Sequence, residues 1–273
     1  MNSYVRHTIM TPLRGLHVKW LALALHPWSK VERRAYRDRI RRRWFTQFAA
    51  EALAKFWDLA HAYPRQINVW LEFGTLLGAY RENGIISHDT DIDIGISDST
   101  DVGGFITYLT QHGFKLKRSF RLHSDDLRLH GRTVEYTLTY HGLASIDLFV
   151  LDEPPDGQGC YYCFDGERGL TWRQTLKKYH GLLFTHIWKV QKFGLRQITF
   201  LGRDWNIPAD THQHLAAIYG ADYMTPKAYS FEDRPLDREV LLGQETMGEL
   251  IERPDKRRVT ITKPGYSRHP GSH

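Results

Sequence analysis

Residues 88–96 read His-Asp-Thr-Asp-Ile-Asp-Ile-Gly-Ile, and this stretch decides the fold. On a β-strand alternate side chains share a face. We therefore expect a strand over 91–96 with Asp91 and Asp93 on one face and the isoleucines on the other, in a core. Asp89 joins the acidic face if the strand begins early. Carboxylates this close repel one another, so the arrangement predicts a divalent cation, Mg²⁺ or Mn²⁺, bound to them.

Two alternatives exist for this acidic stretch. An EF-hand loop also opens Asp-x-Asp-x-Asp, but it needs glycine at its sixth position and glutamate at its twelfth, where this chain has Ile94 and Thr100. The other alternative is a solvated acidic edge without chemistry. The interleaved isoleucines argue against it, because they would pull unpaired carboxylates against a core.

A third carboxylate lies in the apolar run Ser145-Ile146-Asp147-Leu148-Phe149-Val150. An aspartate in the middle of a buried strand is unusual without a partner. If this strand lies beside 91–96, Asp147 completes a site in which Asp91, Asp93 and Asp147 are the catalytic residues and metal ligands. An ion pair between Asp147 and an arginine is the alternative.

A candidate phosphate-binding turn precedes the acidic stretch. Gly74 and Thr75 follow an apolar segment, 67–73, that we expect to be a strand, and Thr75 is expected to cap a helix over 76–82. Backbone N–H groups and a hydroxyl at such a turn hold phosphate. Arg81, near the end of that helix, offers a two-pronged contact to phosphate oxygens, or else a surface ion pair. The layout of a Gly-Thr turn, Asp-x-Asp and a later Asp resembles the nucleotidyltransferase fold.

The rest of the chain predicts an α+β domain with a mixed or antiparallel sheet flanked by helices. Helices are expected over 44–64, 99–113, 171–193 and 208–219, and strands over 114–122, 132–140 and 144–151, with a short hairpin over 197–207. Residues 152–170 are expected to form a loose segment, and periodicity is lost after about residue 230. The pair Cys160 and Cys163 has zinc-knuckle spacing without a second pair, which leaves a zinc site open.

The net charge of +6 is unevenly distributed. Residues 1–43 hold 11 Lys or Arg and 2 acidic residues, and 252–273 hold 6 and 2, whereas 44–251 hold 20 and 27. An acidic body argues against nucleic acid as a partner, because Lys and Arg supply that affinity. We expect a helical, basic N-terminal extension over 1–43, a catalytic domain over 44–230 and a C-terminal extension over 231–273 with a disordered basic tail. The N-terminal extension fits an anionic membrane surface or a solvated helix.

Three stretches resemble the LicD/fukutin family. They are 75–94 (Thr-Leu-Leu-Gly-Ala-Tyr-Arg-Glu-Asn-Gly-Ile-Ile-Ser-His-Asp-Thr-Asp-Ile-Asp-Ile), 146–149 (Ile-Asp-Leu-Phe) and 200–226, which includes Tyr-Gly-Ala-Asp-Tyr-Met-Thr-Pro. The family often has proline and then an aromatic residue where this chain has Ser87 and His88.

The resemblance implies a nucleotidyltransferase-like fold and transfer of a substituted phosphate. The donor would be CDP-activated, such as CDP-choline or a CDP-alditol. The acceptor would be a sugar hydroxyl of a cell-surface glycan, as in capsule or lipopolysaccharide biosynthesis, and CMP would leave. Asp91, Asp93 and Asp147 carry over as metal ligands. The residues that carry over as substrate-binding are Gly74, Thr75, Arg81, His88 and Asp89.

The expected protein is thus a cytoplasmic phosphotransferase, peripheral on the inner face of the membrane. The alternatives are a nucleotidyltransferase that transfers NMP and a non-catalytic metal-binding relative.

Overall fold

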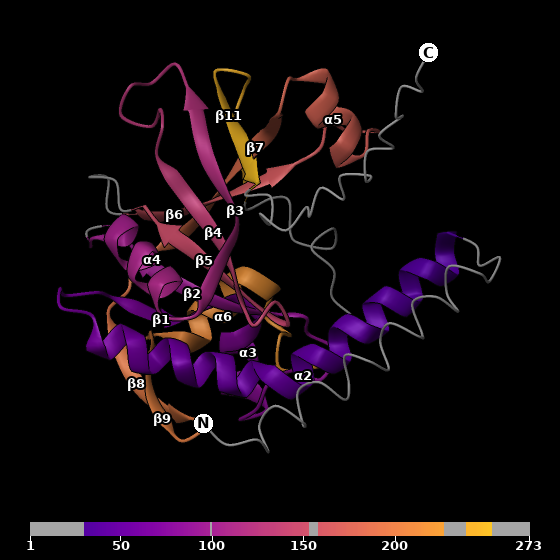
Figure 1. Ribbon diagram of the computed structural model, residues 1–273. Helices are drawn as coiled ribbons and strands as arrows, with labels where there is room; N and C mark the ends of the chain where they lie inside the picture. The colour runs from indigo at the N-terminus through magenta and orange to yellow at the C-terminus, as the bar shows by residue number, and fades with distance from the viewer. Residues whose placement is uncertain (1–29, 99, 153–157, 227–238, 253–273) are drawn as a thin grey trace, which may run out of the picture.

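The computed structural model describes residues 30–98, 100–152, 158–226 and 239–252. Within these ranges five helices and eleven strands form a mixed α+β structure, as predicted (Figure 1). In chain order they are α2 (Lys30–Ala62), β1 (Val69–Leu71), α3 (Phe73–Arg81), β2 (Asp91–Ser97), α4 (Val102–Gln111), β3 (Phe114–Ser124), β4 (Thr133–Tyr140), β5 (Ala144–Leu151), β6 (Gln158–Asp165), α5 (Trp172–Lys178), β7 (Leu182–Gln191), β8 (Leu195–Phe200), β9 (Arg203–Pro208), α6 (Thr211–Tyr219), β10 (Glu239–Leu241) and β11 (Thr246–Glu252).

Nine strands form one sheet in the order β1-β2-β5-β4-β3-β11-β7-β10, with β6 paired to β7. Strands β2 and β5 run parallel, and the other described pairs in this sheet are antiparallel. A bridge between Asp152 and Cys160 ties the end of β5 to β6, so the sheet curls back on itself. Strands β8 and β9 form a separate hairpin.

The alternating Asp and Ile residues of β2 lie on opposite faces of the strand, as predicted. Ile92, Ile94 and Ile96 are buried in the largest apolar cluster, against Phe45, Leu53 and Phe56 of α2. Burying an isoleucine side chain stabilises a fold by about 1.5–3 kcal/mol, so these residues fix which face of β2 is inward. A one-residue slip would bury the aspartates instead. Asp91 and Asp93 therefore lie on the opposite face of β2.

Local signals fix several turns and helix ends. The β4–β5 hairpin turns at His141 and Gly142, both with positive φ, as the sequence predicts. Helix α6 begins after Asp210, whose side chain accepts from the N–H of Gln213, and ends at Gly220 (φ 95°). Helix α3 begins three residues earlier than expected, because Glu72 rather than Thr75 caps it.

Three expectations about secondary structure were wrong. Residues 171–193 do not form one helix: α5 ends at Lys178, His180 and Gly181 have positive φ, and β7 follows. The loose segment at 152–170 contains β6, which pairs with β7. Strand β11 lies after residue 230, yet it pairs with both β3 and β7. Each missed strand is defined by pairing with segments far along the chain.

Helix α2 and strand β11 connect the expected extensions to the expected catalytic domain. Helix α2 runs through residues 43 and 44 without a break, and its N-terminal part projects beyond the rest of the molecule (Figure 1). Strand β11 makes part of the expected C-terminal extension a member of the main sheet. Residues 1–29 and the expected disordered tail at 253–273 lie outside the described residues. Among the described helices, none has the length and apolar character needed to cross a membrane.

Candidate active site

Asp93 and Asp147 lie directly opposite each other on the parallel strands β2 and β5. The sequence-based condition for a shared carboxylate site, that these two strands are neighbours, is met. The same row continues across the sheet to Thr137 on β4 and Arg118 on β3. Asp91 lies two residues before Asp93 on β2, opposite Ser145. Parallel register thus brings together acids that are more than fifty residues apart in sequence.

The Gly74–Thr75 turn holds Asp93 in place. The N–H of Gly74 donates to Asp93 Oδ2 at 2.9 Å, and the N–H of Asp93 donates to Thr75 Oγ1 at 2.8 Å. These two residues, expected on the phosphate side, therefore lie against a proposed metal ligand. A Cβ at residue 74 would be 3.1 Å from Asp93 Oδ2 and 3.5 Å from Asp89 Oδ2, which explains the glycine.

The carboxylates are in an environment that disfavours their charged forms. Burial raises the pKa of Asp93 well above its ordinary value, and the negative charges of Asp91, Asp147 and Asp89 raise it further. Burial and Asp91 likewise raise the pKa of Asp147. Burial, with Asp91 and Glu82, raises the pKa of Asp89 to about 7. On β4, burial and then Asp147 raise the pKa of Glu135. A bound cation would reverse these shifts.

The donor atoms at this site are of the kind that a hard divalent ion takes. Carboxylate oxygens come from neighbouring strands, and Asp147 Oδ1 is buried with no hydrogen-bond partner. Buried polar atoms without a partner are rare and call for an explanation such as an ion. Across the described parts of the chain, however, no three His, Cys, Asp or Glu side chains are already arranged to hold a metal ion. The acidic residues have suitable oxygen ligands and lie on neighbouring strands. Their carboxylate groups, as described, do not converge on one point.

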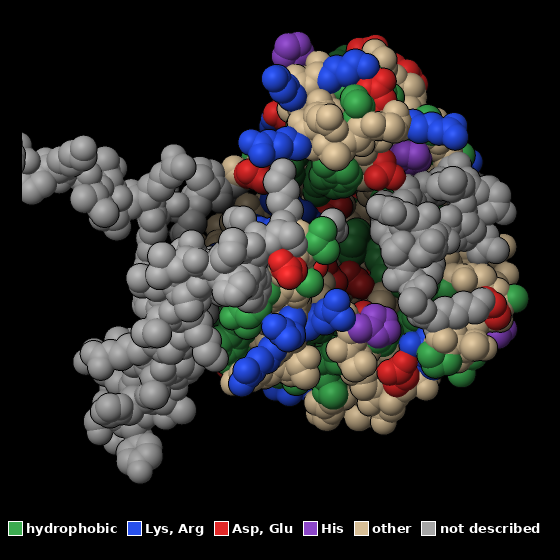
Figure 2. Space-filling model, turned by 90° about the vertical axis from the view of Figure 1, so that its right-hand side faces the viewer, with side chains coloured by type: hydrophobic (Ala, Val, Ile, Leu, Met, Phe, Trp, Pro, Cys, Tyr) green, Lys and Arg blue, Asp and Glu red, His purple; other side chains and the backbone are tan. Residues whose placement is uncertain are grey.

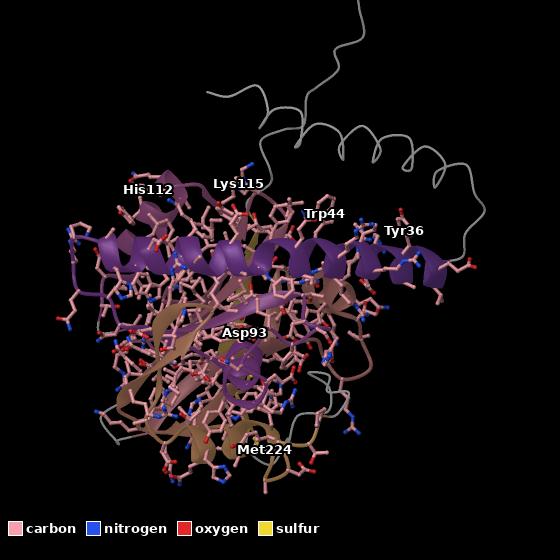
Figure 3. All side chains as sticks on the ribbon, turned by 90° about the horizontal axis from the view of Figure 1, so that it is seen from below. Tyr36, Trp44, Asp93, His112, Lys115 and Met224 are labelled. Carbon is pink, nitrogen blue, oxygen red and sulfur yellow. The ribbon has the colours of Figure 1, made fainter. Side chains whose placement is uncertain are left out.

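A cavity of about 220 Å³ opens beside Asp91. Seen from the side toward which α2 projects, the molecule is hollowed, with acidic side chains inside the hollow and Lys, Arg and His side chains at its rim (Figure 2). In the view from below, Asp93 lies between α2 and the segment that carries Met224 (Figure 3). The cavity is lined by Gly74, Leu77, Arg81, Ile86, His88, Asp89, Thr90, Asp91, Tyr219, Asp222, Tyr223 and Thr225.

Arg81 is firmly placed on the cavity wall. Its Nη1 donates to the backbone oxygen of Tyr223 at 3.1 Å, and its Nε donates to Glu82 at 3.0 Å. Arg81 also forms an ion pair with Glu82, as the alternative expected, although its own side chain is only 9% exposed. Gly74, His88 and Asp89 line the same cavity, so four of the five residues assigned to the substrate border it.

Glu72 is a residue that the sequence analysis missed. Its fully buried carboxylate accepts hydrogen bonds from Trp70 Nε1 (2.7 Å) and the Tyr161 hydroxyl (2.6 Å), and its Oε1 lies 2.7 Å from His214 Nε2. Burial by itself would raise the pKa of Glu72, but His214 and the hydrogen bonds outweigh burial and lower it. Glu72 thereby joins β1, β6 and α6 one residue before the turn that holds Asp93. In the sequence, a single glutamate in the apolar segment 67–73 does not indicate such a buried network.

Other residues at the site belong to segments for which the sequence predicts a different role. Arg41 Nη2 lies 3.3 Å from Asp91 Oδ2, although Arg41 belongs to the basic run expected at a membrane. Tyr219 and Tyr223 line the cavity. Cys160 and Cys163 form no disulfide, and neither belongs to a three-residue metal-binding group among the described side chains.

Replacing Gly74 with alanine is expected to lower activity by about 10–100-fold, the usual cost of disturbing a residue that orients a metal ligand. The new Cβ would push on Asp93 Oδ2, while the fold should remain intact. The matched control is Gly103→Ala in α4, where a Cβ would meet nothing within 4 Å. Transfer rates and melting temperatures of both variants test this. Equal activity of the two would contradict the assigned role of Gly74.

The comparisons with known proteins agree with this geometry. The family model described as "LicD/FKTN/FKRP, nucleotidyltransferase domain" matches residues 66–210, more than half of the chain. The mouse and human proteins named ribitol-5-phosphate transferase FKTN are each 27% identical over 169 residues, which is 61% of this chain and 32% of theirs. An uncharacterized protein of Rickettsia typhi is 42% identical over 55 residues, which is 19% of this chain and 18% of that protein.

The aligned region spans about a third of the curated transferases. The family model's match at 66–210 contains β1, α3, β2 and β5, which together carry Gly74, the acidic residues and Arg81. The resemblance inferred from the motifs is therefore confirmed: this chain belongs to the LicD/FKTN/FKRP family of nucleotidyltransferase domains.

Proposed function

We propose that this protein transfers a substituted phosphate from a CDP-activated donor to a sugar hydroxyl of a cell-surface glycan or its precursor. The acceptor oxygen forms a bond to the donor's outer phosphorus, the bond between the two phosphates breaks, and CMP leaves. The observation that carries the proposal is the pair Asp93 and Asp147, held side by side next to a cavity that contains Arg81. The naming of two relatives as ribitol-5-phosphate transferases supports an alditol phosphate as the transferred group.

The position of each site residue indicates its role in the proposed reaction. Asp91, Asp93 and Asp147 would hold Mg²⁺ or Mn²⁺, which when bound supplies positive charge to the donor's phosphate oxygens. Arg81 binds the donor's phosphates from the cavity wall, since its guanidinium is fixed by Tyr223 and Glu82. Tyr219 and Tyr223 offer aromatic surface to the cytosine base. A carboxylate at this site takes the proton of the acceptor hydroxyl.

A screen of CDP-linked donors tests the reaction class. The purified protein is incubated with CDP-ribitol, CDP-glycerol or CDP-choline, a glycan extract and Mg²⁺, and CMP and the modified glycan are measured. Release of CMP with a phosphate-modified glycan is the expected result. Pyrophosphate release from CTP with a nucleotidylated acceptor would instead identify a nucleotidyltransferase. Binding of metal without turnover of any donor would indicate a non-catalytic relative.

We further propose that the protein is cytoplasmic and lies on the inner face of the membrane. Arg37, Arg39, Arg42 and Arg43 are exposed on α2, whose N-terminal part projects from the molecule. Each Lys or Arg near an anionic surface contributes about 1 kcal/mol to binding. The acidic body would favour an orientation with α2 toward the lipid.

Reversing the charge of Arg37, Arg42 and Arg43 to glutamate is expected to abolish flotation with vesicles that contain phosphatidylglycerol. The control reverses Lys55, Lys189 and Arg196, and it should float like the wild type. These variants are preferred to truncation at Trp44, which would cut α2 in its middle. Equal flotation of both triple variants would refute the proposed membrane contact.

A further inference from the structure

His212 lies on α6, outside the cavity, and contacts a residue of the cavity wall. Its Nδ1 lies 2.8 Å from the hydroxyl oxygen of Tyr223, and the centroids of the two rings are 5.5 Å apart. His212 is exposed and does not line the cavity, whereas Tyr223 is buried and lines it. An exposed side chain therefore forms a hydrogen bond with a buried residue of the donor side of the site.

Tyr223 is held from two helices, at opposite ends of the residue. Its hydroxyl contacts His212 of α6, and its backbone oxygen accepts from Arg81 Nη1 of α3 at 3.1 Å. A turn shortens the path from α6 to this residue, since the N–H of Tyr223 donates to the backbone oxygen of Gly220 at 3.2 Å. Helices α3 and α6 also contact each other. Tyr223 thus bridges the two helices beside the cavity.

The orientation of Arg81 depends on Tyr223. The hydrogen bonds that the structure describes for the Arg81 side chain go to Glu82 and to Tyr223. Glu82 is the next residue in the chain and is exposed, so the contact with Tyr223 is the one that fixes the guanidinium against another part of the protein. The donors of a guanidinium form a rigid fork, and its orientation decides how well they match phosphate oxygens. A shift of Tyr223 therefore changes how Arg81 meets a phosphate.

The hydrogen bond to His212 contributes to orientation more than to burial. The Tyr223 ring belongs to the largest apolar cluster, so apolar contacts keep it buried with or without a partner for its hydroxyl. The bond fixes the outer end of the side chain relative to α6. Binding groups need this kind of support from the residues behind them to be held in a productive geometry.

We propose that His212 is a positioning residue for donor binding, which orients Arg81 through Tyr223. This inference rests on the proposed function, in which Arg81 binds the phosphates of the donor. His212 would set the affinity for a CDP-activated donor without contacting it. Loss of its hydrogen bond would let Tyr223 and Arg81 take other orientations, and the diphosphate of the donor would bind more weakly.

The test measures binding and needs no turnover. CDP and inorganic pyrophosphate are titrated separately, in a magnesium-containing buffer, into the wild type, His212→Ala, His212→Asn, Tyr223→Phe and the double variant His212→Ala/Tyr223→Phe. Calorimetry gives the dissociation constants. The control is Gln213→Ala, which removes an exposed neighbour on α6 that donates to Gln191 and not to the cavity wall. Melting curves establish that each variant is folded.

His212→Ala and Tyr223→Phe are each expected to weaken CDP binding by about 2- to 10-fold, the effect of losing one hydrogen bond. Pyrophosphate binding should weaken by the same factor, because the effect reaches the ligand through Arg81. The double variant should bind no more weakly than either single variant, since both substitutions break the same bond. His212→Asn keeps a hydrogen-bonding atom near Nδ1 and should restore most of the affinity, and Gln213→Ala should bind as the wild type does.

Four results would overturn the inference. They are wild-type CDP affinity in His212→Ala, losses that multiply in the double variant, unchanged pyrophosphate binding in His212→Ala, and the same loss in Gln213→Ala. Failure of the wild type to bind CDP would reject the donor site together with the role of His212. A failed donor screen alongside the expected changes in binding would reject the proposed reaction alone.

Discussion

Replacing Asp93 or Asp147 with asparagine is expected to abolish transfer and, in the absence of divalent ions, to raise the melting temperature. Transfer should fall by about a thousandfold or more, because a metal ligand that stabilises transition-state charge by several kcal/mol is lost. Stability should rise because each substitution removes a buried negative charge from a cluster of acids that raise one another's pKa. Active sites commonly sacrifice stability in this way.

The gain in stability should depend on pH. A carboxyl group whose pKa is raised by folding stabilises the folded state at low pH, and this contribution is lost as pH rises through the folded pKa. For Asp93 the loss begins near the ordinary value of 3.8 and extends well above it. The melting temperature of Asp93→Asn should therefore exceed that of the wild type more at pH 8 than at pH 4.

Melting curves in EDTA at several pH values, together with transfer rates in Mg²⁺, measure both effects. Asp58→Asn is the control, since Asp58 forms an exposed ion pair with Arg203 on α2 and β9. It should retain activity and melt as the wild type does. Full activity in Asp93→Asn and Asp147→Asn would rule out the carboxylate pair as the catalytic centre.

Replacing Glu72 with alanine is expected to lower the free energy of unfolding by about 3–5 kcal/mol, the usual cost of removing one partner of a buried charge pair. Four donors, from Trp70, Tyr161, His214 and the backbone of Phe73, would lose their acceptor. Glu72→Gln keeps the shape and one acceptor oxygen, so it should cost less, about 1–3 kcal/mol.

Activity separates a positioning role from a purely structural one. The backbone N–H of Glu72 donates to the backbone oxygen of Asp93 (3.2 Å), and Phe73, with a φ of 42°, follows it directly. Glu72→Gln should therefore lower the transfer rate at temperatures where the variant is still fully folded. The pKa of Glu72 is lowered in the folded state, so its stabilising contribution is present at neutral pH and lost as pH falls through that pKa.

Urea unfolding and transfer rates check this, with Glu51→Gln as the control. Glu51 is also a glutamate that accepts from a tyrosine, Tyr140, but it is exposed, and its replacement should change neither property appreciably. If Glu72→Ala unfolds at the same urea concentration as the wild type, the buried network does not stabilise the fold.

The sequence was sufficient where structure is decided locally. Alternation of Asp and Ile fixed the strand and both faces of β2, because burying three isoleucines outweighs any competing register. The β4–β5 hairpin and the end of α6 were also predictable, from a His-Gly turn and from a terminal glycine. Strands β6, β7 and β11 were not, because their pairing partners are distant in sequence and a short apolar run does not distinguish strand from helix.

The same distinction applies to the site. The sequence by itself determined which acids share a face of β2 and the family to which the chain belongs. Only the tertiary structure decided which side chains surround these acidic residues. It brought Arg41 to Asp91 and Glu72 to His214. Charges interact through space at distances of a few ångströms, and nothing in the spacing of residues along a chain encodes that proximity.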